Sequence, residues 1–99
     1  MPKRKNPEMS AQGPVVIFLK GGANPVIDET LSIITDAGGR RIDITSCRCR
    51  IAWSANNDRG LMVWVEVDGD ERSPFTIPRG QIEKITKSGI QVWPKLAKS

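Results

Sequence analysis

Two segments of this 99-residue chain alternate apolar and polar side chains with a period of two, and they constrain its fold more than any other feature. The first segment runs from Cys47 to Trp53 and the second from Leu61 to Val67, with a short polar stretch between them. A period of two is typical of a β-strand with one buried face. The sequence therefore predicts a β-hairpin whose odd-numbered residues face the core.

The even-numbered side chains of this hairpin form the candidate partner-binding surface, which we call the Arg–Trp face. Its members are Arg48, Arg50, Met62, Trp64 and Glu66. The expected register places Arg50 opposite Trp64, and it places Arg48 opposite Glu66. Three interpretations stay open: a protein contact, a nucleic-acid contact, and a cross-strand ladder that only stabilises the sheet.

A second hairpin is expected around the turn Asp36-Ala37-Gly38-Gly39, because glycine supplies the positive φ that tight turns need. This turn places Ile33 opposite Ile42, so that apolar side chains share one face. A helix over residues 28–37 is the alternative, since apolar residues there also have helical spacing.

The remaining segments predict short strands and one helical turn. Val15–Leu19 is a continuous apolar run, expected to be buried on both sides or to lie at an interface, and it is the best candidate for an uncovered edge strand. Apolar parity changes near Thr45-Ser46, which predicts a β-bulge or bend. Strands are expected at 75–77 and 90–93, and one helical turn at 81–85.

This order of elements predicts an all-β protein with one short helical turn. The pattern is similar to a small SH3-like or Sm-like barrel, or to a compact sandwich of antiparallel hairpins. We expect a disordered basic arm at residues 1–13, a single β-rich domain at 14–94, and a frayed C-terminus at 95–99.

The formal net charge of +4 comes from 15 cations and 11 anions, and it is concentrated at the two ends of the chain. Residues 21–78 carry more anions than cations, whereas residues 1–20 and 79–99 are basic. A basic surface spread over the fold is therefore not expected. The Lys3-Arg4-Lys5 block favours either a solvated tail or an electrostatic contact with phosphate or an acidic protein.

Few residues in this sequence suit catalysis. The chain has no histidine, which removes the commonest general base and histidine-ligated metal sites. Cys47 and Cys49 are expected to be reduced and packed on the apolar face, although neighbouring arginines leave a reactive thiol as the alternative. We expect no cofactor, no metal and no small-molecule substrate.

The sequence thus predicts a non-enzymatic interaction module that contacts a protein or self-associates as a homo-oligomer. The alternative is a nucleic-acid-associated protein that uses six residues: Lys3, Arg4, Lys5, Arg48, Arg50 and Trp64. An enzyme without histidine chemistry is the third class. Because no apolar run is long enough for a membrane span or a signal peptide, a cytoplasmic protein with no membrane partner is expected.

Overall fold

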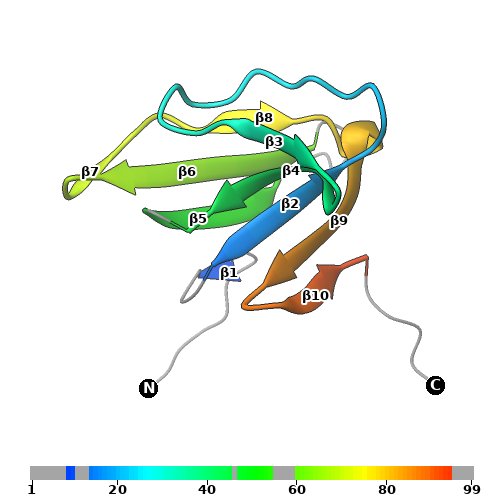
Figure 1. The fold of residues 1–99 in the computed structure, drawn as a ribbon. Coiled ribbons are helices and arrows are strands. Elements are labelled where there is room, and N and C mark those ends of the chain that lie inside the picture. The colour runs from blue at the N-terminus through cyan, green and yellow to red at the C-terminus, as the bar shows by residue number, and fades with distance from the viewer. Residues whose placement is uncertain (1–8, 11–13, 46, 55–59, 95–99) are drawn as a thin grey trace.

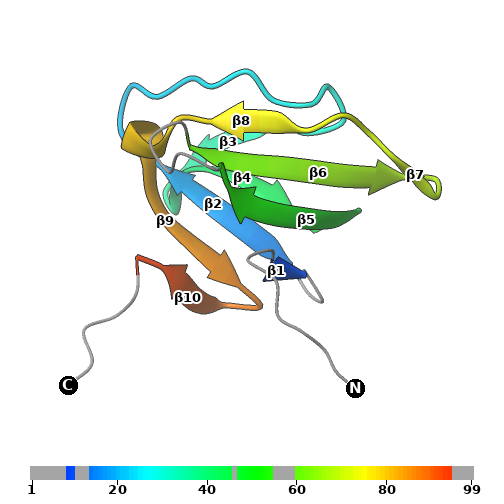
Figure 2. The same cartoon turned by 180° about the vertical axis from the view of Figure 1, so that it is seen from behind.

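The computed structural model describes residues 9–10, 14–45, 47–54 and 60–94. Its strands form two antiparallel sheets of five strands each (Figure 1), and Figure 2 shows them from behind. The all-β prediction is confirmed, since a single 3-10 turn is the only helical element within the described ranges. No ladder between described strands joins the two sheets into a closed barrel.

The first sheet is built around one central strand. It contains β1 (Met9–Ser10), β5 (Arg48–Trp53), β6 (Leu61–Val67), β7 (Asp70–Glu71) and β8 (Phe75–Ile77). Strand β6 pairs with β5 on one side, while β7 and β8 pair with successive parts of its other side. Strand β1 pairs with the outer edge of β5.

The second sheet has the order β10-β9-β2-β4-β3. Its strands are β2 (Val15–Leu19), β3 (Ile33–Asp36), β4 (Gly39–Ile44), β9 (Ile82–Lys87) and β10 (Ile90–Trp93). The 3-10 turn η1 (Arg79–Gln81) leads from β8 of the first sheet into β9 of the second.

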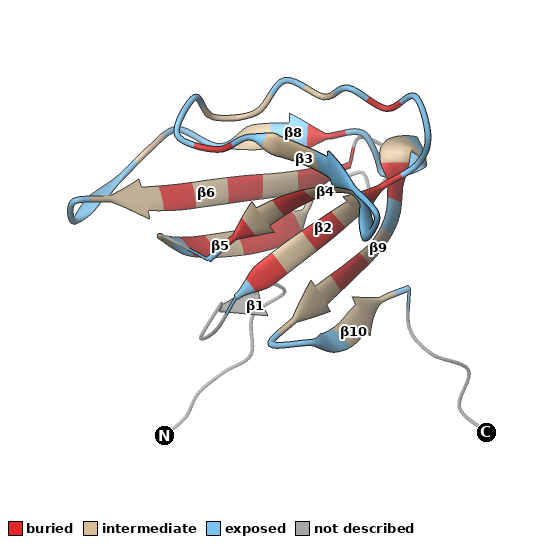
Figure 3. Ribbon diagram, viewed as in Figure 1, coloured by how far each residue is buried: buried red, intermediate tan, exposed pale blue. Residues whose placement is uncertain are grey.

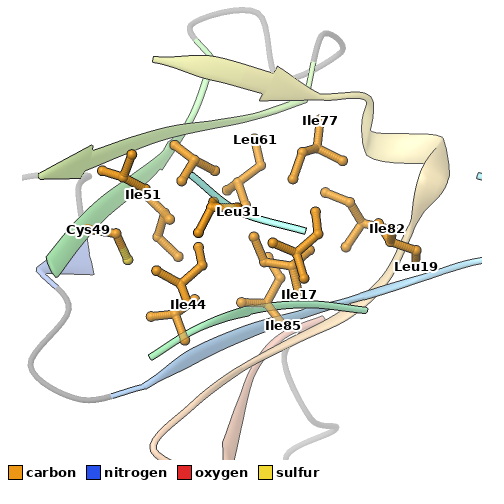
Figure 4. Close-up of a cluster of buried hydrophobic side chains, with 14 of the residues drawn as sticks. Ile17, Leu19, Leu31, Ile44, Cys49, Ile51, Leu61, Ile77, Ile82 and Ile85 are labelled. Atoms are coloured by element: carbon orange, nitrogen blue, oxygen red, sulfur yellow. The ribbon is translucent and has the colours of Figure 1, made fainter. Parts of the chain in front are cut away.

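Buried and half-buried residues alternate along β2 and most of β6 (Figure 3), and the buried residues of both sheets form one hydrophobic core. Ile17 and Ile85 of the second sheet lie on the same core as Leu61 and Ile77 of the first (Figure 4). All four are fully buried, and no polar or charged residue of the described part is buried. Removal of this apolar surface from water is the main force that holds the sheets together.

The register of both predicted hairpins is confirmed. Arg50 lies opposite Trp64 in the β5–β6 ladder, and Ile33 lies opposite Ile42 in the β3–β4 ladder. The helix considered for residues 28–37 is wrong, because Ile33–Asp36 is a strand. In each hairpin, the register that the turn residues favour is also the one that buries the apolar face. A slip of one residue would expose the apolar side chains of that face to solvent.

The predicted bulge at Thr45-Ser46 includes Ser46, which lies outside the described residues. On either side of it, β4 belongs to the second sheet and β5 to the first. Buried residues are even-numbered in β4, such as Ile44, and odd-numbered in β5, such as Ile51. Between these two strands the chain therefore passes from the second sheet to the first, and the residues that face the core change from even-numbered to odd-numbered.

Two predictions about single segments are wrong. Val15–Leu19 is not an edge strand, because it pairs with β4 on one side and β9 on the other. Residues 82–85 are not a helical turn but the start of β9, which follows η1. Phe18 pairs with Lys84, whereas the next residue, Leu19, pairs with Ile82. Glu83 is therefore an extra residue in β9, between the two paired positions. This β-bulge turns residues three apart toward the same core.

The chain ends are described only in part. Met9 and Ser10, which the sequence placed in a disordered arm, pair with Ile51 and Arg50 as strand β1. A short strand can satisfy backbone groups that the edge of β5 would otherwise leave unpaired. The remainder of the predicted arm and the predicted frayed residues 95–99 lie outside the described residues. Within the described ranges, no helix has the length and apolar character needed to cross a membrane.

Candidate functional site

The Arg–Trp face lies on the outer side of the first sheet. Its five residues come from two neighbouring strands, with Arg48 and Arg50 on β5 and Met62, Trp64 and Glu66 on β6. They alternate with buried residues such as Ile51 and Val63, which fill the core side of the same strands. The structure therefore brings all five predicted residues together on one surface.

The centre of this face is an arginine stacked on a tryptophan. The Cζ atom of Arg50 lies 4.2 Å from the centre of the Trp64 ring. A cation at this distance is attracted to the negative face of the ring, and such contacts are worth about 0.5–1 kcal/mol at exposed sites. The stacking of Arg50 on Trp64, expected in the ladder interpretation, is confirmed.

Glu71 of β7 binds the same guanidinium. Arg50 Nε donates to Glu71 Oε2 at 3.0 Å, and Arg50 Nη2 donates to Glu71 Oε1 at 3.2 Å. These hydrogen bonds lower the pKa of the Glu71 carboxyl. Paired donors and acceptors fix the plane of the guanidinium over the ring as well as its position.

Arg48 and Glu66 are opposite each other in the β5–β6 ladder, as predicted. Among the described residues, however, no ion pair or hydrogen bond joins their side chains. The anion bonded on this face is Glu71, and its partner is Arg50. The face therefore presents an exposed cation on β5 and a half-buried anion on β6, whose charges are unpaired within the described chain.

Sequence reasoning missed Glu71 as a member of this surface. Asp68 and Gly69 form the turn between β6 and β7, and both residues have positive φ. That turn places Glu71 opposite Glu66, and so extends the sheet by one short strand. A signal for Glu71 was present in the sequence: if the two-residue alternation of β6 is continued through this turn, Glu71 falls on the same face as Glu66.

A second aromatic cluster lies where β5 and β10 end. The ring centres of Trp53 and Trp93 are 5.1 Å apart, with the rings tilted by 55°. Arg79 of η1 lies 5.7 Å from the first ring centre and 5.9 Å from the second. Both tryptophans pack against the core. This cluster joins the two sheets.

The outer face of the second sheet carries a smaller version of the stacked pair. Lys84 of β9 lies over the ring of Phe18 of β2, with its Nζ 4.7 Å from the ring centre. These residues are direct cross-strand neighbours. No carboxylate of the described chain binds Lys84, so this pair lacks the third component found around Arg50.

The two cysteines are free, with Cys49 buried and Cys47 half-buried. Burial raises the pKa of Cys49 to about 11, and burial also raises the pKa of Cys47. Reactive cysteines instead have a lowered pKa. The packing interpretation therefore fits these thiols better than the nucleophile interpretation. Within the described ranges, no group of three or more His, Cys, Asp or Glu residues is arranged to hold a metal ion.

The described part of the chain is electrically balanced, with nine Lys and Arg against nine Asp and Glu. The whole formal excess of +4 thus belongs to residues outside the described ranges, including Lys3, Arg4 and Lys5. Several arginines of the fold are also bound to carboxylates, as Arg41 is to Asp36. A basic binding surface is therefore not a property of the described fold.

Comparison with protein families, with characterised proteins and with solved structures finds no match to this chain.

Proposed function

We propose that this chain is a non-enzymatic interaction module that binds a protein through the Arg–Trp face. The supporting observation is the Arg50 guanidinium, which lies over Trp64 while Glu71 balances its charge. Ordering a flexible side chain on binding costs about 0.5–1.5 kcal/mol. Because Arg50 is already held in place, much of this cost is met before a partner arrives. Tryptophan and arginine are the residues most enriched in binding hot spots.

A protein partner suits this surface better than a phosphate backbone does. Phosphate binding depends on cations that release counterions, and its strength grows with their number. On this face, Glu71 already neutralises Arg50, which leaves Arg48 as the cation without a bonded carboxylate in the described chain. Protein interfaces, in contrast, combine a central aromatic residue with a polar rim of both charge signs.

We also propose that the two sheets are those of a small SH3-like or Sm-like barrel. The chain changes sheet between β4 and β5, and η1 leads into β9, which returns to pair with β2. One bent strand that serves two sheets is a frequent device in small barrels. Such a scaffold holds the Arg–Trp face on two paired strands rather than on loops, which favours a rigid binding surface.

Affinity capture from the native host, after nuclease treatment, tests the proposed function with two matched variants. Trp64→Ala removes the ring under Arg50, and Phe18→Ala removes the other cation-stacked ring, on the second sheet. The wild type and Phe18→Ala should retain the same partner protein, whereas Trp64→Ala should lose it. The purified partner should then bind Trp64→Ala at least about tenfold more weakly. Equal capture by all three proteins would contradict the proposal.

Electrostatic contact between the chain ends and nucleic acid is the second candidate function, favoured by the location of the excess charge. Binding of a labelled oligonucleotide should then weaken by orders of magnitude between about 50 and 200 mM salt. Replacement of Lys3, Arg4 and Lys5 by glutamine should reduce both the affinity and the salt dependence. Affinity that is unchanged by salt would remove this candidate.

A further inference from the structure

We propose that the partner of the Arg–Trp face is a second copy of this chain, bound in an isologous dimer whose two-fold axis runs parallel to β5 and β6. This inference rests on the proposed function, because it names the partner of the same face. It follows from the self-complementary pattern of side chains across the two strands.

Two of the three rows across β5 and β6 on the outer face join residues of opposite character. The three rows are Arg48 with Glu66, Arg50 with Trp64, and Ala52 with Met62. The first row holds a cation and an anion, and the second holds a guanidinium and an aromatic ring. The third holds Ala52, which is buried, beside the long and flexible side chain of Met62. In the first two rows, each residue of one strand thus has its physical complement on the neighbouring strand.

A two-fold axis in the plane of the interface exploits this pattern. Suppose that the axis runs between β5 and β6 along their length. Each outward residue of β5 then lies opposite one residue on β6 of the second copy, and that residue is the same one that it pairs with across the strands of its own chain. Arg48 then faces Glu66 of the second copy, and this contact occurs twice. A two-fold axis perpendicular to the strands would instead exchange the two ends of the face, so Arg48 would not lie opposite Glu66 of the second copy.

The charges at one end of the face are available for such a contact. Arg48 is exposed and Glu66 is half-buried, and neither side chain has an ion pair or hydrogen bond within the described chain. Their backbones are direct partners in the ladder, yet their side chains do not meet. A second copy would give each charge a partner of opposite sign, and complementary charge sets the register of an interface.

The net charge of the described residues does not oppose this association. The nine cations and nine anions of the described residues balance, so the two folded bodies have little net repulsion. The apolar members Met62 and Trp64 lie toward the middle and one end of the face, with the charged row at the other end. Two sheets that pack face to face keep their strands within about 30° of each other, which matches the proposed axis.

Sedimentation equilibrium over a wide concentration range tests the dimer. Wild-type protein should show a reversible monomer–dimer equilibrium. Arg48→Glu places two anions opposite each other twice per dimer, and Glu66→Arg does the same with two cations. Each variant should raise the dimer dissociation constant at least about tenfold. Lys20→Glu and Glu83→Arg are the matched controls, since they make the same charge changes at exposed positions of the second sheet or just after β2.

Mixing the two reversal variants is the decisive measurement. In a heterodimer of Arg48→Glu with Glu66→Arg, both charge contacts again join opposite signs. An equimolar mixture should therefore restore association to within about threefold of the wild type, although neither variant dimerises well alone. The double variant, which carries both reversals in one chain, should also dimerise. Circular dichroism checks that each variant is folded.

Three results would overturn the inference: a wild-type protein that stays monomeric at high concentration, single variants that dimerise as well as the wild type, or a mixture that does not recover. None of these results bears on capture of a different protein by the wild type and its loss in Trp64→Ala. Failure of the second-copy inference is thus distinguishable from failure of the proposed function.

Discussion

Arg50 and Glu71 are 21 residues apart in the chain, yet two hydrogen bonds join their side chains across the Trp64 ring. Arg50 therefore connects three strands of the first sheet: it extends from β5, covers a residue of β6, and ends on a residue of β7. Arg50, Trp64 and Glu71 thus order the centre of the Arg–Trp face before another protein binds to it.

Replacement of Glu71 by glutamine should change how stability depends on pH. The hydrogen bonds from Arg50 hold the pKa of Glu71 below its unfolded value, which is about 4.3. The pairing thus stabilises the fold above that pH, and this contribution is lost as pH falls through the lower, folded pKa. Asp28 and Asp36 also have lowered pKa values, but they are common to both proteins. Between about pH 5 and 3, thermal unfolding of the wild type should shift more than that of Glu71→Gln. Parallel curves would contradict the pairing.

Two residues on β2 should differ strongly in their sensitivity to truncation. Ile17 is fully buried between the sheets, whereas its neighbour Val16 points away from the core and is only half-buried. Ile17→Ala should destabilise the protein by about 2–5 kcal/mol, because it removes buried methyl groups and leaves a cavity. Val16→Ala should cost clearly less. Chemical denaturation measures both values, and equal losses would mean that the inward face of β2 is misassigned.

Gly60 precedes β6 and should tolerate no side chain. Its φ is +138°, and an added Cβ would lie 2.0 Å from the carbonyl oxygen of Ile77. Gly60→Ala should therefore destabilise the fold by at least about 2 kcal/mol, through both a strained backbone and a clash with neighbouring main chain. Gly80 is the matched control, since a Cβ there meets nothing within 4 Å. Denaturant unfolding of Gly80→Ala should remain close to that of the wild type, and a similar loss in both variants would be inconsistent with the close approach.

The thiols should be slow to react in the folded protein. Burial raises the pKa of Cys49 to about 11, whereas an ordinary thiol has a value near 8.5. Near neutral pH the thiolate of Cys49 should therefore be at least about 100-fold scarcer than in the unfolded chain. Iodoacetamide labelling followed by peptide mass spectrometry measures each cysteine separately. Denatured protein provides the control, and rapid native labelling of Cys49 would contradict its burial.

Local pattern was sufficient to predict the β5–β6 hairpin down to its residue pairs, including Arg50 with Trp64. The reason is that period-two alternation assigns each side chain to one face, and the opposite face must be buried as a set. Ile82 and Ile85 are different, because their three-residue spacing predicts one helical turn at 81–85. An extra residue at Glu83 produces that spacing within a strand, and the sequence contains no separate signal for the bulge.

Strand neighbours in space were not predictable in the same way. The apolar run Val15–Leu19 predicts an edge strand that seeks a partner, but β9 from the far end of the chain pairs with it and makes it central. The candidate site shows the same limit, since its five residues follow from alternation whereas Glu71 joins only through β7. Pairing between distant segments depends on how the two sheets share one core, which no local window contains.

The sequence by itself determined the all-β class, two hairpin registers, and the set of side chains that form the Arg–Trp face, because these depend on residues close together in the chain. Only the tertiary structure decided which strands lie side by side, how Arg50 is held between Trp64 and Glu71, and that Arg48 and Glu66 stay apart. Those outcomes depend on the packing of two sheets around a common core, where many side chains compete for the same space and the same charge partners.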